Sequence, residues 1–137
     1  MDPKILELVR DDPRYPYEAY EFLCDAVSFT QEVLGRIPEE TDDPDTDYHV
    51  CGDELARGVC ELALREFGMM ARVVFRLWGI QRTDDIGNIV FNLIRAERLS
   101  KSERDDPEDF HDLFDIEKML TEEFELILGD MPGRSDR

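Results

Sequence analysis

The sequence predicts a mainly α-helical single domain of about six helices with one β-hairpin. At 137 residues the chain has the usual length of one domain. Apolar residues recur at helical spacing over several stretches, and glycine or proline residues separate these stretches from one another. This periodicity, with a 42% share of hydrophobic residues, argues against a disordered chain although 36% of the residues are charged.

The first unit, residues 1–36, is expected to form two helices. Asp2 is the predicted N-cap of a short helix that has Pro3 in its first turn and ends before Pro13. A second and longest helix is expected from Tyr17 to Gly35. Its apolar positions form one continuous stripe: Ala19, Phe22, Leu23, Ala26, Val27, Thr30, Val33 and Leu34.

Residues 37–52 are predicted to form an acidic loop. A run of this kind is solvated unless a cation neutralises it. A calcium loop is the alternative, because Asp43, Asp45, Asp47 and Glu54 match positions 1, 3, 5 and 12 of an EF-hand. Tyr48 stands where the sharp turn of that loop requires glycine, so the solvated loop is the favoured interpretation.

The main unit, residues 53–128, is expected to begin with three helices. Asp53 is the predicted cap of the first, which ends at Gly68. The next helix, from about Met69 to Trp78, is apolar nearly all round and is therefore expected at the centre of the core. Thr83 is the predicted cap of a further helix with one apolar face: Ile86, Ile89, Val90, Leu93 and Ile94.

A β-hairpin is expected next, with arms at residues 99–103 and 110–114. Phe110 and Phe114 alternate with polar residues in the second arm, as in a half-buried strand. Three helices followed by a hairpin make residues 53–114 winged-helix-like. Asp115 is expected to cap a last helix, and residues 129–137 to form a flexible tail.

The charge of the chain is −18, from 34 acidic and 16 basic residues. A field of this sign repels phosphate backbones and anionic lipid head groups. Asp84 and Asp85 stand at the start of the helix that would enter a DNA groove, and the predicted wing is also acidic. Nucleic acid and membranes are therefore disfavoured as partners, and a protein partner is favoured.

The segment from residue 55 to residue 98 is the exception, with seven arginines against five acidic residues. Arg72 and Arg76 lie one helical turn apart and share a face. Most of these arginines are expected to pair with acidic residues inside the fold. The candidate partner-binding residues are Arg72, Arg76, Arg82, Asn88, Asn92 and Arg95.

No motif indicates catalysis, a cofactor or a membrane anchor. The chain has no GxSxG motif, no phosphate-binding glycine loop and no dinucleotide fingerprint. It has no apolar run long enough to span a membrane and no visible secretory signal. Three cysteines without C-x-x-C spacing fit a reducing compartment, so a cytoplasmic location is expected.

A resemblance to a known family rests on three stretches: Asp2-Pro3-Lys4-Ile5 with Asp12-Pro13-Arg14-Tyr15-Pro16-Tyr17-Glu18-Ala19-Tyr20; Phe75-Arg76-Leu77-Trp78-Gly79-Ile80 with Thr83-Asp84-Asp85-Ile86-Gly87; and Ile89-Val90-Phe91-Asn92-Leu93-Ile94. The chain resembles a family of small acidic proteins of unknown function from planctomycetes and verrucomicrobia. The resemblance implies a bacterial, intracellular protein and carries no activity with it.

These observations together favour a non-enzymatic module that binds another intracellular protein. One alternative is a winged-helix-type regulator that binds nucleic acid through the net-positive helical segment. The other alternative is a calcium- or metal-binding protein that uses Asp43, Asp45, Asp47 and Glu54.

Overall fold

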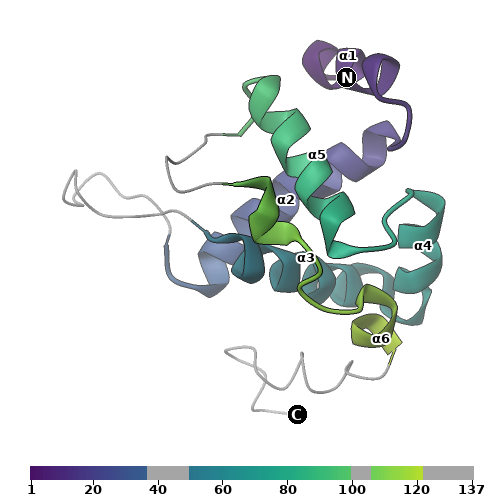
Figure 1. Ribbon diagram of the computed structural model, residues 1–137. Helices are drawn as coiled ribbons and strands as arrows, with labels where there is room; N and C mark the ends of the chain where they lie inside the picture. Colours follow the sequence, from purple (N-terminus) through teal and green to yellow (C-terminus); the bar gives the residue numbers. More distant parts are fainter. Residues whose placement is uncertain (37–49, 100–105, 122–137) are drawn as a thin grey trace.

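The computed structural model describes residues 1–36, 50–99 and 106–121 (Figure 1). These residues are mainly α-helical, as predicted, and they contain no β-strand. In chain order the elements are α1 (Pro3–Asp11), α2 (Tyr17–Val33), α3 (Gly52–Phe67), the 3-10 helix η1 (Gly68–Met70), α4 (Ala71–Leu77), α5 (Thr83–Arg95), the 3-10 helix η2 (Pro107–Phe110) and α6 (Ile116–Thr121).

Helix α3 is the element around which the others pack. Helices α2, α4, α5 and α6, together with η2, all contact it (Figure 1). Its buried residues explain this position, because they cover more than one side of the helix: Leu55, Ala56, Gly58, Val59, Cys60, Leu62, Ala63 and Leu64. The largest helix interface is that between α2 and α3, so this pair forms the base of the fold.

Close approach between α2 and α3 depends on Gly58. A Cβ atom at this position would overlap the side chain of Thr30 on α2. Thr30 is itself buried, and its hydroxyl donates a hydrogen bond to the carbonyl oxygen of Ala26 at 2.7 Å. The absent side chain of Gly58 therefore sets the distance between the two helices.

Four aromatic rings fix α4 against this base. The Phe22 ring lies 5.7 Å from Phe67, 6.0 Å from Phe75 and 5.3 Å from Trp78, measured between ring centroids. These rings come from α2, α3, α4 and the residue that follows α4. Tilted and edge-to-face pairs at such distances add to the stabilisation that burial alone provides.

The expectation that the helix of residues 69–78 lies at the centre of the core is wrong. Within α4 only Ala71 and Phe75 are buried. The side chains of Met69, Met70 and Leu77 are exposed at 91%, 57% and 78%. A helix of one or two turns at the edge of the molecule (Figure 1) can bury only the face that packs on the rest of the fold, so Val73 and Val74 are only half-buried and Leu77 faces solvent.

The prediction that residues 110–114 form the second arm of a β-hairpin is also wrong. Residues 107–110 form η2, because Asp106 accepts a hydrogen bond from the backbone N–H of Glu108 at 2.9 Å and Pro107 occupies the first position. Phe110 is buried against Gly87 of α5, and Asp112 has a φ of 46°, which is incompatible with a strand. Most of the first arm, residues 100–103, lies outside the described residues, as does the 129–137 tail.

Only some of the helix caps are the residues predicted from the sequence. Asp2 and Asp115 cap α1 and α6 as predicted, since their carboxylates accept hydrogen bonds from the N–H groups of Lys4 and Lys118. Helix α3 instead begins at Gly52, one residue before the predicted cap Asp53. Thr83 lies within α5, where its buried hydroxyl accepts a hydrogen bond from the N–H of Leu113 at 3.0 Å.

Hydrogen bonds hold the start of α5 against residues 111–113. His111 Nδ1 lies 2.8 Å from Asp84 Oδ2, and the N–H of Asp112 donates to Asp84 Oδ1 at 3.2 Å. The hydrogen bond to Asp84 raises the pKa of His111, and the Coulombic attraction of Asp84, Glu108 and Asp112 acts in the same direction. The pKa of Asp84 is lowered, first by His111 and then by the N–H of Asp112.

Replacing Gly58 by alanine is expected to lower the free energy of unfolding by about 1–3 kcal/mol, because the added methyl overpacks the α2–α3 contact. Urea denaturation measures the change. In the double variant Gly58→Ala/Thr30→Ala the loss should be smaller than the sum of the two single losses, because Thr30 no longer obstructs the methyl. Strictly additive losses would contradict this account of the interface.

The Asp84–His111 pair is expected to make stability depend on pH near neutrality. Since the folded pKa of His111 is raised above its ordinary value of 6.5, its contribution is complete below about pH 6.5 and is lost as the pH rises through the folded value. The difference in Tm between the wild type and His111→Gln should therefore shrink from pH 6 to pH 9. A difference that stays constant over this range would show that the pair does not couple to folding.

Candidate functional site

The exposed side of η1 and α4 combines apolar and cationic side chains. Met69, Val73 and Leu77 follow one another at intervals of four residues; Met69 and Leu77 are exposed and Val73 between them is half-buried. Arg72 and Arg76 lie beside them with the same spacing. We call these five residues the α4 face. The chain from Gly68 to Arg82 holds three arginines and no acidic residue, although the whole protein has a charge of −18.

The two arginines of the α4 face share one carboxylate. Glu117 of α6 places Oε1 at 2.6 Å from Arg76 Nη2 and at 3.9 Å from Arg72 Nη1. The side chains of Arg72 and Arg76 remain 46% and 60% exposed, and that of Glu117 is 55% exposed. Among the described residues, two guanidinium groups opposite one carboxylate leave a net positive charge at the surface where α4 and α6 meet.

A pocket of about 190 Å³ opens between α4 and α6 at this ion pair. Its apolar wall consists of buried side chains: Phe75, Ile80, Ile116 and Leu120. Its polar rim consists of exposed side chains: Arg72, Arg76, Gln81 and Glu117. The pocket therefore places the edges of buried apolar side chains directly beside the two arginines.

Of the other candidate partner-binding residues, Asn92 lies inside the fold. Asn92 is only 5% exposed, and its amide donates hydrogen bonds to Tyr20 Oη and to Asp12 Oδ2, each at 3.0 Å. Asp12 also forms an ion pair with Arg14 at 2.7 Å, and the hydrogen bond from Arg14 is the main cause of the lowered pKa of Asp12. Arg95 donates to Asn92 Oδ1 from the surface. These contacts join α5 to the connection between α1 and α2.

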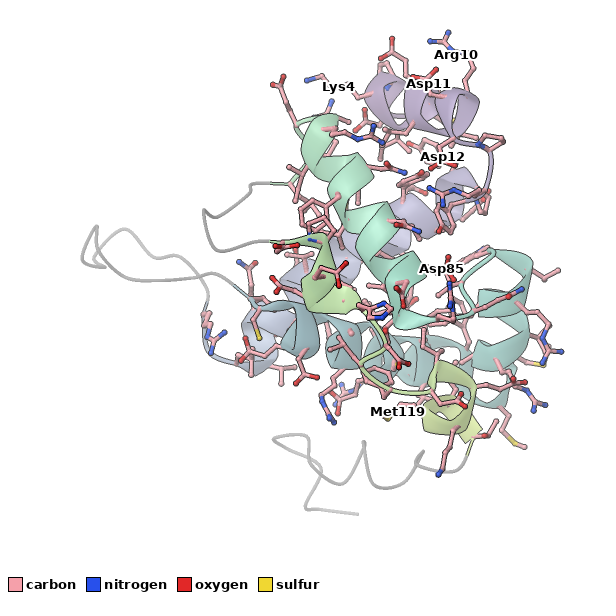
Figure 2. All side chains as sticks on the ribbon, viewed as in Figure 1. Lys4, Arg10, Asp11, Asp12, Asp85 and Met119 are labelled. Atoms are coloured by element: carbon pink, nitrogen blue, oxygen red, sulfur yellow. The ribbon has the colours of Figure 1, made fainter. Side chains whose placement is uncertain are left out.

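Asn88 belongs to a second part of the same interface. Its amide donates to Tyr15 Oη at 3.0 Å, and the Tyr15 hydroxyl donates to Asp85 Oδ1 at 2.7 Å. Burial is the first cause of the raised pKa of Tyr15, and the hydrogen bond to Asp85 is the second. Asp12 and Asp85, labelled in Figure 2, mark the two ends of this polar interface.

The candidate partner-binding residues thus occupy three places rather than one surface. Arg72 and Arg76 lie together beside α6, whereas Asn88, Asn92 and Arg95 line the contact between α5 and the α1–α2 connection. The side chain of Arg82 is exposed at the start of α5. Of the predicted residues, Arg72 and Arg76 are the ones that are exposed beside exposed apolar side chains, those of Met69 and Leu77.

The predicted calcium ligands Asp43, Asp45 and Asp47 lie outside the described residues. Glu54 is described, and its Oε1 pairs with Arg36 Nη1 at 2.7 Å and accepts from the N–H of Cys51 at 3.1 Å. The hydrogen bond from Arg36 is the main cause of the lowered pKa of Glu54. Among residues 1–36, 50–99 and 106–121, no three His, Cys, Asp or Glu side chains are placed to hold a metal ion together.

The sequence analysis does not predict the exposure of Met69, Met70 and Leu77 or the position of Glu117. The apolar character of residues 69–78, taken alone, indicates core packing. The acid-free stretch from Gly68 to Arg82 is the signal that could have corrected this interpretation. The pairing with Glu117, 41 residues after Arg76, has no local signal in the sequence.

Among the helices that the structure describes, none combines the length and the apolar character needed to cross a membrane. No family model, no curated protein and no solved structure matches this chain. The resemblance to the planctomycete and verrucomicrobial family therefore stays a prediction.

Proposed function

We propose that this protein is an interaction module that binds another protein through the α4 face. The observation that supports the proposal most directly is the exposure of Met69 and Leu77 beside Arg72 and Arg76. Apolar and arginine side chains gathered on one surface are typical of protein interfaces, where methionine and arginine are enriched. The partner surface that fits this face is apolar and acidic.

The charge distribution supports an acidic partner surface in spite of the overall negative charge. The Debye length is about 8 Å at physiological ionic strength, so acidic groups on the far side of the molecule are largely screened. At contact distance the partner meets the acid-free stretch from Gly68 to Arg82. The overall charge of −18 then acts mainly on approach, where it repels every acidic protein, so that binding requires apolar contacts that offset this repulsion.

We also propose that this protein is cytoplasmic. Cys24, Cys51 and Cys60 are all free thiols. Cys60 is buried in α3, and burial raises the pKa of its thiol to about 12, which keeps it protonated and unreactive. Unpaired cysteines suit a reducing compartment.

Charge reversal of the arginine pair, Arg72→Glu/Arg76→Glu, is expected to abolish capture of the partner. The tagged protein is used to isolate partners from its native lysate, with and without nuclease, and the recovered proteins are quantified by mass spectrometry. Proteins that the wild type captures after nuclease treatment should fall at least about tenfold with the charge-reversed variant, because repulsion replaces attraction at the interface.

The control is Arg10→Glu, which changes an exposed arginine of α1 whose one ion-pair partner in the described part of the chain is its neighbour Asp11. This variant should retain the partners of the wild type. Equal recovery with the charge-reversed α4 face would refute the proposal. Partners lost on nuclease treatment would favour the nucleic-acid alternative instead.

A further inference from the structure

The pocket between α4 and α6 is closed on one side by an ion pair that is easily exchanged. Glu117 lies 2.6 Å from Arg76 and 3.9 Å from Arg72, and all three side chains are about half exposed. Exposed ion pairs contribute little to stability, because water solvates the separated charges almost as well. A second carboxylate could therefore replace that of Glu117 with little loss to the fold.

The pocket is also large enough for one bulky apolar side chain. Its volume is about 190 Å³. A cavity of about 150 Å³ lined by apolar residues accommodates a benzene molecule, so a leucine or phenylalanine side chain fits this volume. The wall formed by Phe75, Ile80, Ile116 and Leu120 would lie against such a side chain.

We propose that this pocket recognises a carboxylate next to a bulky apolar side chain on the partner protein. The partner's carboxylate takes the place of Glu117 between Arg72 and Arg76, and the apolar side chain enters the pocket. Glu117 is then an internal competitor that occupies the arginines while no partner is bound. This inference rests on the proposed function, because it names the chemistry that the α4 face selects.

Charge complementarity indicates that an acidic side chain of the partner binds between Arg72 and Arg76. Glu117 is a carboxylate that already lies within ion-pair distance of both guanidinium groups, so the geometry for an acidic side chain exists in this structure. Planar guanidinium groups match the two oxygens of a carboxylate. On a helical partner, an acidic residue and a leucine or phenylalanine three or four positions apart would meet the arginines and the pocket together.

The test uses a random library of twelve-residue peptides, selected on the intact protein. Selected peptides should be enriched in an aspartate or glutamate close to leucine, isoleucine, phenylalanine or tryptophan. A fluorescent peptide with the selected sequence is then titrated against the wild type and four variants, with fluorescence anisotropy as the measurement.

Glu117→Gln should bind the peptide about two- to fivefold more tightly than the wild type, because the internal competitor is removed. Arg72→Gln/Arg76→Gln should bind at least about tenfold more weakly. Gln81→Trp, which places a large side chain at the exposed rim of the pocket, should also weaken binding. Arg10→Gln, which removes one positive charge elsewhere, should leave the affinity unchanged. Thermal melts of each variant show that it is folded.

The failures of the two proposals are distinguishable. Peptides without acidic residues, no selected peptide at all, or an unchanged affinity in Glu117→Gln would overturn the pocket inference. The interaction function would still stand if partner capture from lysate depended on Arg72 and Arg76. Wild-type affinity in Arg72→Gln/Arg76→Gln, together with unchanged capture by the charge-reversed variant, would overturn both.

Discussion

The aromatic contacts of Phe22 with Phe67, Phe75 and Trp78 are the constraint on which the candidate site depends. Helix α4 runs only from Ala71 to Leu77, which is too short to be stable without tertiary contacts. Because the rings anchor one side of this short helix to α2 and α3, the opposite side is held at the surface. Met69 and Leu77 are thus exposed as a consequence of how the helix is anchored.

Polar contacts connect the remaining elements around the same base. The start of α5 is joined to residues 111–113 through Thr83 and Asp84, and its middle is joined to the α1–α2 connection through Asn88 and Asn92. These four side chains are buried or half-buried. By contrast, Arg72 and Arg76 are exposed, and the one carboxylate they share among the described residues, that of Glu117, is exposed as well. The fold therefore separates polar residues that hold it together from polar residues that remain exchangeable.

The total charge governs how the protein interacts at long range, whereas the local charge governs what a partner meets at contact. The total of −18 describes how the protein behaves at long range, where it disfavours anionic surfaces. The stretch from Gly68 to Arg82 describes what a partner meets at contact, where it finds arginines and apolar side chains. An acidic protein can thus present a surface for acidic partners, provided that apolar contacts accompany the charges.

The sequence by itself determined the mainly helical class, the approximate ranges of α1, α2, α3 and α5, and the caps at Asp2 and Asp115. These features depend on local spacing and on single capping residues, so neighbouring positions in the chain are enough to predict them. Only the tertiary structure decided that α4 is peripheral, that Phe110 belongs to a 3-10 helix and that Asn92 is buried. The same holds for the meeting of Glu117 with Arg72 and Arg76. Periodicity shows that a face is apolar, but which face is covered depends on contacts between residues far apart in the chain.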